Sequence, residues 1–260
     1  MYDQFSEDYD RFVNWKARLE FEMPFLTQQL DSLEAQAPLR VLDAACGTGM
    51  HAIELTRRGY HAVGADLFPE MIDRAQANAA AAGVNTLFFP AGFGDLARTF
   101  LQEHLLPFDA VICLGNSLPH ILSTRGLIDA LADFAACLRP GGLLLMQNRN
   151  FDAVLAARER WMAPQSYREG NREWVFLRSY DYELDGQIAF NILTLQRDGT
   201  NVWQQRVTST HLRPLAQTDL GGALATAGFE RVRYYGGMDG SPFDIEKSGD
   251  LVVTARRAGG

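Results

Sequence analysis

The chain has 260 residues, of which 47% are hydrophobic and 22% charged, and its formal net charge is -8. This apolar content excludes a disordered or fibrous protein, and the acidic balance argues against nucleic acid as a partner. There is no apolar run of about 18 residues and the N-terminus is polar, so we expect neither a membrane span nor a signal peptide. The three cysteines lack metal-ligand spacing, which indicates a reduced, cytoplasmic protein without a metal site.

Residues 1–38 are predicted to form a mostly helical lid segment. Its aromatic residues, which either pack the helices or close over a site, are Tyr2, Phe5, Tyr9, Phe12 and Trp15. From residue 39 to 150, short apolar runs alternate with helical stretches. The predicted strands are 39–44, 60–65, 86–89, 108–114 and 143–147, and the predicted helices are 49–58, 69–82, 96–105 and 124–138. Apolar strands separated by helices are typical of a parallel sheet that is covered on both sides.

The pattern changes after residue 150. Residues 151–213 are predicted to form a small antiparallel β cap over the substrate site, with three strands at 174–183, 187–197 and 202–212. The Asp-Gly pairs between these strands favour tight hairpin turns. A helix at 215–227 and strands at 232–235 and 251–255 complete the main sheet. The predicted fold is therefore α/β, with a doubly wound, mostly parallel seven-stranded sheet built from residues 39–150 and 214–260.

Two glycines stand where the first predicted strand turns into a helix, in the run Val41-Leu42-Asp43-Ala44-Ala45-Cys46-Gly47-Thr48-Gly49. Glycine there lets a ligand approach the backbone closely, and ligands of parallel sheets bind at the carboxyl ends of the strands. Asp66 ends the second strand, where a carboxylate can accept both hydroxyls of a ribose. An ordinary strand-to-helix turn is the alternative without a ligand.

The loop bears no additional glycine, serine or basic residue that could hold a pyrophosphate, and Asp43 comes just before it. These features favour S-adenosylmethionine, a cofactor with an adenosine but no phosphates, over the nicotinamide dinucleotide of a dehydrogenase. We interpret Cys46 as a small buried residue of the turn rather than a nucleophile.

Together with Arg139-Pro140-Gly141-Gly142, these motifs resemble those of class I S-adenosylmethionine-dependent methyltransferases, whose fold is Rossmann-like. The run Phe108-Asp109-Ala110-Val111-Ile112-Cys113-Leu114-Gly115-Asn116-Ser117, followed by His120, is similar to glycine N-methyltransferases, as is Asn148-Arg149-Asn150. The similarity covers most of residues 39–155. It is looser around Trp15-Lys16-Ala17-Arg18, which resembles the basic entry segment of that family.

The resemblance implies a set of cofactor-binding residues, namely Arg18, Ala45, Gly47, Gly49, Asp66, Leu67, Met71 and Leu114. In this set Asp66 would hold the ribose and Arg18 would pair with the cofactor carboxylate. The chain departs from the family at Ala91-Gly92-Phe93, where the family has Ala-Asn-Trp beside the adenine. We expect Phe93 to lie against the adenine, and either Asp95 or the backbone to contact its amino group.

Asn116, His120 and Arg149 match positions around the amino-acid substrate of the family and are the predicted catalytic residues. The guanidinium of Arg149 suits a bidentate clamp on the substrate carboxylate, with a rim salt bridge as its alternative role. Asn116 is expected to act at the tip of its strand, whereas His120 is equally well explained as a packing residue. Tyr180, Tyr182 and His211 lie on predicted cap strands and could reach the pocket.

The sequence therefore predicts a methyltransferase that acts on a small molecule, most simply by N-methylation of glycine, sarcosine or a related amine. Two alternatives stay open: an O- or S-methyltransferase of natural-product metabolism, and a non-catalytic protein that binds or senses the cofactor. The expected cofactor is S-adenosylmethionine, with S-adenosylhomocysteine as the product.

Overall fold

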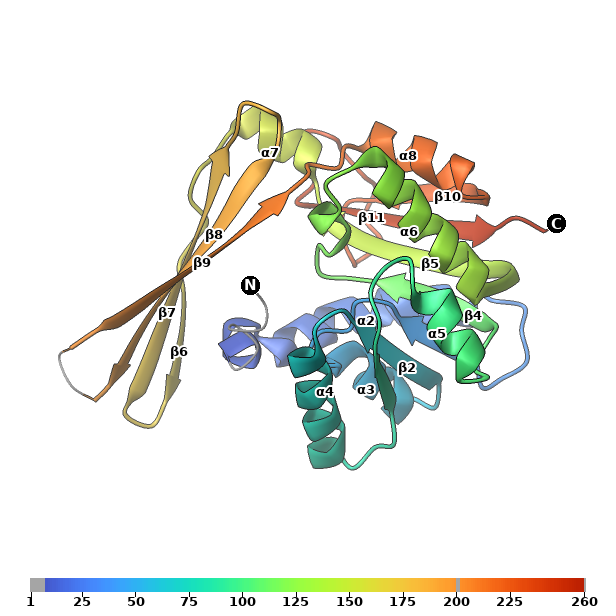
Figure 1. Ribbon diagram of the computed structural model, residues 1–260, viewed down its shortest axis with the longest axis horizontal. Helices are drawn as coiled ribbons and strands as arrows, with labels where there is room; N and C mark the ends of the chain where they lie inside the picture. The colour runs from blue at the N-terminus through green and yellow to red at the C-terminus, as the bar shows by residue number, and fades with distance from the viewer. Residues whose placement is uncertain (1–7, 200–201, 260) are drawn as a thin grey trace.

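Two β-sheets organise the protein: a seven-stranded sheet covered by helices and a four-stranded sheet that projects from it (Figure 1). The computed structural model describes residues 8–199 and 202–259, so Tyr2 and Phe5 lie outside the described residues. No helix in these two ranges combines the length and the apolar character needed to cross a membrane.

The larger sheet has the strand order β10-β11-β5-β4-β1-β2-β3. Its strands are β1 (Arg40–Asp43), β2 (His61–Asp66), β3 (Leu87–Pro90), β4 (Phe108–Cys113), β5 (Leu138–Arg149), β10 (Phe229–Tyr235) and β11 (Asp250–Arg257). Strands β1 to β5 are parallel, whereas β11 pairs antiparallel with β5 and β10. This arrangement confirms the predicted fold class. Because the chain changes direction across the sheet between β1 and β4, a ligand crevice is expected at their carboxyl ends.

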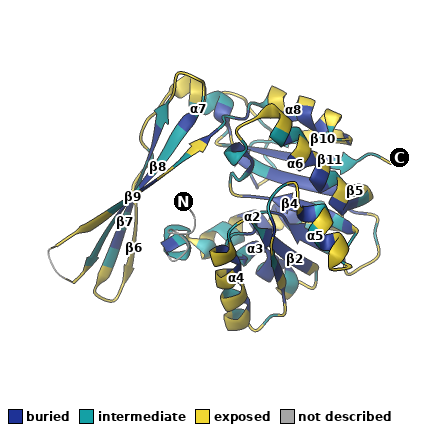
Figure 2. Ribbon diagram, viewed as in Figure 1, coloured by how far each residue is buried: buried dark blue, intermediate teal, exposed yellow. Residues whose placement is uncertain are grey.

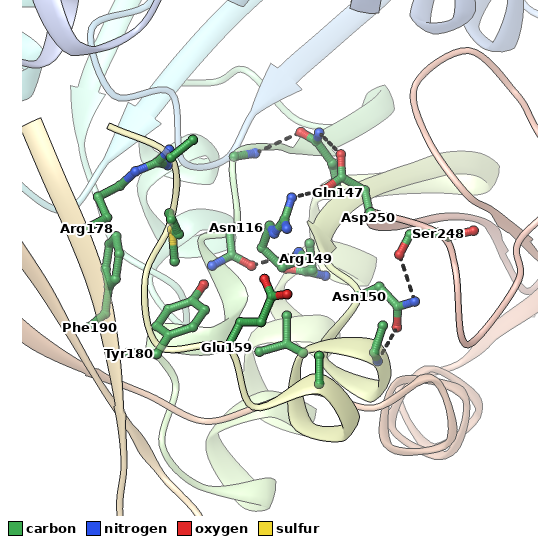
Figure 3. Close-up of a pocket in the computed structure, with 18 of the residues that line it drawn as sticks. Asn116, Gln147, Arg149, Asn150, Glu159, Arg178, Tyr180, Phe190, Ser248 and Asp250 are labelled. Atoms are coloured by element: carbon green, nitrogen blue, oxygen red, sulfur yellow. Dashed lines mark hydrogen bonds and ion pairs between the residues drawn. The ribbon is translucent and has the colours of Figure 1, made fainter. Parts of the chain in front are cut away.

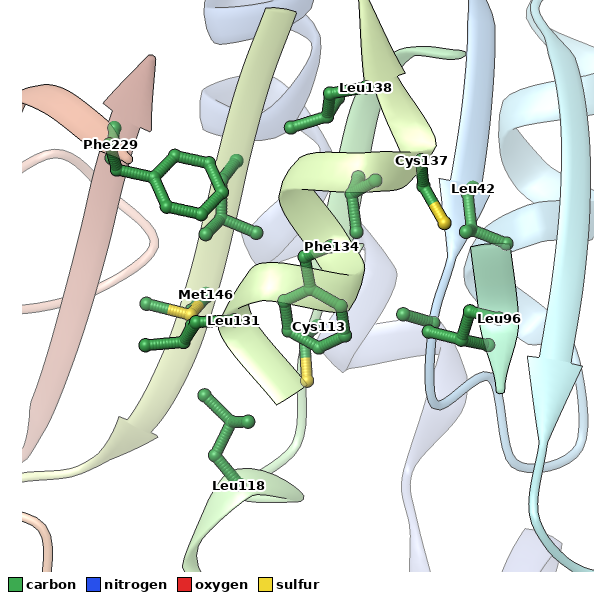
Figure 4. Close-up of a cluster of buried hydrophobic side chains, with 14 of the residues drawn as sticks. Leu42, Leu96, Cys113, Leu118, Leu131, Phe134, Cys137, Leu138, Met146 and Phe229 are labelled. Carbon is green, nitrogen blue, oxygen red and sulfur yellow. The ribbon is translucent and has the colours of Figure 1, made fainter. Parts of the chain in front are cut away.

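Helices cover both faces of this sheet, as its doubly apolar strands predict. One face carries α2 (Trp15–Asp31), α3 (Met50–Arg57) and α4 (Pro69–Ala82), and the other carries α5 (Leu96–Gln102), α6 (Thr124–Cys137) and α8 (Gln217–Thr226) (Figure 1). In Figure 4, Leu131 and Phe134 of α6 pack on Cys113 and Met146 of the sheet. The inner strands β1, β2, β4, β5 and β11 are largely buried, whereas the edge strands β3 and β10 are more exposed (Figure 2). Burying a side chain such as Phe134 contributes about 1.5–3 kcal/mol, so each helix layer is firmly held.

The smaller sheet is antiparallel and has the order β6-β7-β8-β9. Its strands are β6 (Gln165–Glu169), β7 (Arg172–Tyr182), β8 (Ile188–Asp198) and β9 (Gln204–Leu212). The turn at Asp185-Gly186 lies where the sequence predicts it, and Gly186 has a positive φ. At the second predicted turn, Asp198 is the last residue of β8 and Gly199 has a positive φ, and residues 200–201 lie outside the described residues. The sequence predicted three cap strands, whereas the sheet has four. Strand β6 was not predicted, because all of its residues are exposed and its sequence, Gln-Ser-Tyr-Arg-Glu, lacks an apolar alternation.

Three other features differ from the sequence-based expectation. Pro140-Gly141-Gly142 is not a turn before a strand but part of β5, where the pairing with β4 shifts register and Gly141 has a φ of 74°. A short helix, α7 (Phe151–Ala157), follows β5 and is capped by the side chain of Asn150. A single 3-10 turn, η1 (Leu118–His120), follows β4. Both short elements lie at the carboxyl edge of the large sheet, where the candidate site is found.

Candidate functional site

The glycine loop between β1 and α3 is held in a left-handed backbone conformation. Gly47 and Gly49 have φ values of 52° and 82°. A Cβ on Gly49 would lie 2.7 Å from the ring of Phe88 and 2.8 Å from the Cβ of Ala75. Gly49 is therefore needed for the packing of the loop. It is not among the residues that line the two cavities described below, and its contact with the cofactor stays a prediction.

Asp66 at the end of β2 is oriented by backbone hydrogen bonds. Its Oδ2 accepts from the N–H of Gly47 at 2.9 Å, and its Oδ1 accepts from the N–H of Phe68 at 3.0 Å. Burial raises the pKa of this carboxyl, and the backbone donors oppose that shift. Each carboxylate oxygen has further acceptor capacity, so the group is positioned to receive two hydroxyl donors from a ligand.

A cavity of about 710 Å³ opens beside this loop, and we call it the loop cavity. It is lined by all of the predicted cofactor-binding residues except Gly49, namely Arg18, Ala45, Gly47, Asp66, Leu67, Met71, Phe93, Asp95 and Leu114. Phe93 packs edge-on against Phe134, with 5.3 Å between the ring centroids. Asp95 is more than half exposed and forms an ion pair with Arg98 at 2.8 Å.

Two further side chains that line the loop cavity, Asp43 and Cys46, have raised pKa values. Asp43 is buried, and its Oδ2 has no hydrogen-bond partner. Burial, together with the charge of Asp66, raises the pKa of Asp43 to about 7. Burial also raises the pKa of the Cys46 thiol well above its usual value, which supports its interpretation as a packing residue rather than a nucleophile.

A second cavity, of about 850 Å³, lies between the carboxyl edge of the large sheet and the four-stranded sheet, and we call it the cap cavity. Its walls include the ends of β4 and β5, the segment around α7, the inner face of β7 and β8, and the loop before β11 (Figure 3). Four residues line both cavities: Tyr9, Arg18, Gly115 and His120. The two cavities therefore adjoin one another at these four residues, which we call the junction.

Asn116 and Arg149 both line the cap cavity and are joined to one another. Asn116 has a φ of 68°, and its Oδ1 accepts from the backbone N–H of Arg149 at 2.9 Å (Figure 3). The guanidinium of Arg149 is half exposed, and its Nη1 lies 3.4 Å from Oδ1 of Asp250. This single long ion pair leaves most of the guanidinium donors available to a ligand.

His120 ends η1 at the junction. Burial lowers its pKa to about 4, so the imidazole is neutral at pH 7. A neutral ring can accept a hydrogen bond from an amine, but with that pKa it is a weak base.

Arg18, on α2, also lies at the junction. Its Nε donates to both carboxylate oxygens of Glu22 at 3.0 and 3.1 Å, and its Nη2 donates to Gln147 at 3.3 Å. Glu22 in turn lies 2.7 Å from His51. This buried network holds the Arg18 guanidinium in place. The sequence similarity to the family is loose in this segment, so it gave only a weak indication of where Arg18 lies.

The N-terminal segment lies across the junction. Asp10 accepts hydrogen bonds from Thr48 at 2.6 Å and Arg74 at 2.8 Å, which fix this segment to the body. Tyr9 and Phe12 pack with the buried cluster of the four-stranded sheet. Tyr9 therefore packs on the sheet and also lines both cavities, whereas closure of this segment over the site stays a prediction.

The cap cavity also contains polar residues that were not predicted as site residues, chiefly Gln147, Glu159, Arg178 and Asp250. Tyr180 and Tyr182 line the same cavity, whereas His211 lines the loop cavity. Alternation along β7 could have indicated Arg178, since residues 176, 178 and 180 share one face of a strand.

Comparison with known proteins identifies a domain within the chain. Residues 41–142 match a methyltransferase domain. The chain is 38% identical over 153 residues to the glycine/sarcosine N-methyltransferase of Parasynechococcus marenigrum, covering 59% of this chain and 52% of that protein. It therefore spans about half the length of this curated relative.

Solved structures share the fold over nearly the whole chain. A methyltransferase from Clostridium acetobutylicum superposes with a TM-score of 0.77 at 16% identity, covering 99% of both chains. The sugar N-methyltransferase KedS8 from Streptoalloteichus superposes with a TM-score of 0.74 at 22% identity, covering 100% of this chain and 93% of that one. The loop cavity offers a glycine cradle and an oriented carboxylate, which fit an adenosine cofactor without phosphates. Residues 41–142 are thus a methyltransferase domain, the chain shares the fold of S-adenosylmethionine-dependent methyltransferases, and S-adenosylmethionine is its cofactor.

Proposed function

We propose that this methyltransferase methylates the amine nitrogen of a small molecule that carries a carboxylate, such as glycine, sarcosine or a related amine. The observation that carries the proposal is the junction, because there the loop cavity adjoins a second cavity that contains Asn116, His120 and Arg149. The similarity to a glycine/sarcosine N-methyltransferase over 153 residues supports the same acceptor class.

In this proposal the loop cavity binds the cofactor through residues fixed by the fold. Asp66 holds the ribose hydroxyls, Phe93 lies against the adenine, and Arg18 receives the carboxylate of the methionine part. Ala45, Gly47, Leu67, Met71 and Leu114 supply the surrounding contacts. Residues 39–150 and 214–260 then form the cofactor-binding domain, with residues 1–38 as a lid and residues 151–213 as a cap over the acceptor.

The bound cofactor supplies an activated methyl group on a sulfonium. The chain aligns the acceptor with that methyl and excludes water, which are the main requirements of an in-line displacement. The amine must be neutral to react, and the cation of Arg149 disfavours an ammonium ion nearby. His120, neutral at pH 7, can accept a hydrogen bond from the amine, while Arg149 binds the carboxylate.

The test is steady-state methylation of glycine and sarcosine beside their uncharged esters and amides. Arg149→Lys keeps the charge but not the planar fork, so we expect it to reduce kcat/KM nearly as much as Arg149→Ala, by about 2–4 kcal/mol. Affinity for S-adenosylhomocysteine should stay near that of the wild type. Arg125→Ala, which removes an exposed pair with Asp129, is the matched control and should leave both quantities unchanged.

A larger acceptor is the second candidate. The cap cavity has a volume typical of sites for drug-sized ligands, and a sugar N-methyltransferase shares the fold over the whole chain. Preference for neutral analogues, or full activity of both Arg149 variants on the acids, would favour an acceptor of natural-product metabolism methylated on N, O or S. Cofactor binding without turnover on any amine, alcohol or thiol would favour the non-catalytic alternative.

A further inference from the structure

Arg178 has no partner that accounts for its charge. It lies on β7 and lines the cap cavity, with Tyr180 on the same strand face (Figure 3). Its Nε is buried without a hydrogen-bond partner, and no carboxylate within the described residues lies at ion-pair distance from its guanidinium. The ring of Phe12, 5.2 Å away, contacts the guanidinium face but accepts none of its in-plane N–H bonds.

The other arginines of the four-stranded sheet show that this is not a general property of the sheet. Arg168 and Arg197 both pair with Glu173, Arg172 lies 3.7 Å from Asp198, and Arg206 pairs with Asp8. Arg178 is the one arginine of β6–β9 that faces the cap cavity, and the one without an acid. Arg178 is half-buried, and a partly desolvated cation without a counterion is unfavourable, so a ligand that brings a negative charge would be stabilised beside it.

A second cation lies in the same cavity. Burial lowers the pKa of Arg178, and the charge of Arg149 lowers it further. Burial raises the pKa of Tyr180, which both guanidiniums oppose, so the two cations act on the same part of the cavity. The cavity volume also exceeds what glycine or sarcosine would fill.

From these contacts the geometry points to Arg178 as the binding residue for a second anionic group of the acceptor, in addition to a carboxylate on Arg149. This inference rests on the proposed function and narrows it. The acceptor class is then an amine with two separate anionic groups, either an amino dicarboxylic acid or an amino acid that carries a phosphate. Both offer acceptor oxygens that match the planar donors of a guanidinium.

The experiment measures binding to the full-length protein saturated with S-adenosylhomocysteine, by calorimetry. The probes are two matched pairs, aspartate with asparagine and phosphoserine with serine, so that each pair differs in the second anion. In the wild type we expect the anionic member of at least one pair to bind tenfold or more tightly than its neutral partner. The pair that shows this preference distinguishes a carboxylate from a phosphate.

Arg178→Met should abolish the preference, and Arg178→Lys should retain part of it. Arg172→Gln, six residues away on the same strand but outside both cavities, should not change it. Thermal unfolding separates a ligand role from a structural one, because removal of an unpaired, half-buried cation should leave Tm unchanged or raise it. If Arg178→Met fails to fold, the wild-type preference and the Arg178→Lys variant decide the question.

Equal affinity within both pairs in the wild type would overturn the inference, as would a preference that survives in Arg178→Met. Methylation of the same compounds distinguishes the two proposals. Arg178-dependent binding without turnover of any amine would contradict the proposed function and leave the anion site standing. Turnover of glycine, without tighter binding of the compounds that carry a second anionic group, would contradict the anion site and leave the proposed function standing.

Discussion

The loop cavity and the cap cavity adjoin one another but are built in different ways. The loop cavity draws mainly on residues 43–122, with additions from the N-terminal segment and from residues 209–211 of β9, and its Asp66 is fixed by backbone donors that arise from the fold itself. The walls of the cap cavity come from segments as far apart as residues 9 and 250, and one of its cations lacks an acid. The carboxylate proposed to bind the cofactor ribose is thus held by local backbone geometry. The side chains proposed to bind the acceptor are brought together by the fold from distant segments.

The largest expected effect comes from breaking the backbone geometry of the loop cavity. Gly49→Leu would force a side chain into a left-handed conformation and into the space of Phe88, so we expect a loss of about 2–5 kcal/mol in the free energy of unfolding. Urea denaturation measures it. Gly222→Ala, in helix α8 with open space around its Cβ, is the control and should be neutral or slightly stabilising. A Gly49→Leu protein within about 1 kcal/mol of the wild type would show that the loop tolerates other geometries.

The next effect concerns Asp43, the one side chain of the loop cavity with an unpartnered buried oxygen. Its pKa is raised to about 7 in the folded state, so the native protein holds a proton that the unfolded chain releases above about pH 4. Asp43 therefore favours folding at low pH and loses that contribution as the pH rises from about 4 to about 7.

The Asp43→Asn substitution replaces this ionisable carboxyl with an amide that does not titrate. The variant should gain about 2–4 kcal/mol of stability relative to the wild type between pH 4 and pH 8, measured as the difference in unfolding free energy at each pH. Asp129→Asn, at an exposed pair on α6, should give a small difference that does not vary in this way. A flat difference for Asp43→Asn would mean that the carboxyl is already ionised at pH 4 in the folded protein.

The smallest effect tests the adenine side of the loop cavity. Phe93→Ala should weaken S-adenosylhomocysteine binding by about 1–3 kcal/mol, whereas Phe93→Tyr should not. Because Asp95 is exposed and paired with Arg98, we expect Asp95→Asn to have less effect than Phe93→Ala. Calorimetry compares the three variants. A loss of binding free energy in Asp95→Asn as large as that in Phe93→Ala would show that the Asp95 carboxylate accepts a hydrogen bond from the adenine amino group.

Features set by the local sequence were predicted more accurately than features that depend on contacts between distant segments. The large sheet was predictable because its strands are apolar on both faces, and the hairpin between β7 and β8 was predictable because Asp185-Gly186 specifies its turn. Strand β6 was missed because it is held by pairing with β7 alone and buries no side chain. Arg178 was missed because its significance lies in the absence of an acid nearby, which only the folded arrangement reveals. The assignment of Gly49 to the cofactor stays a prediction, and the structure adds a packing reason for this glycine, since a Cβ there would collide with Phe88 and Ala75.

The central claim is that the cofactor occupies the loop cavity and presents its sulfur at the junction, with the acceptor entering from the cap cavity. A crystal structure of the full chain with S-adenosylhomocysteine tests this most directly. We predict ribose hydroxyls within hydrogen-bonding distance of the Asp66 carboxylate and a sulfur that faces Gly115 and His120. A nucleoside bound in the cap cavity, or a sulfur directed away from the junction, would contradict the account.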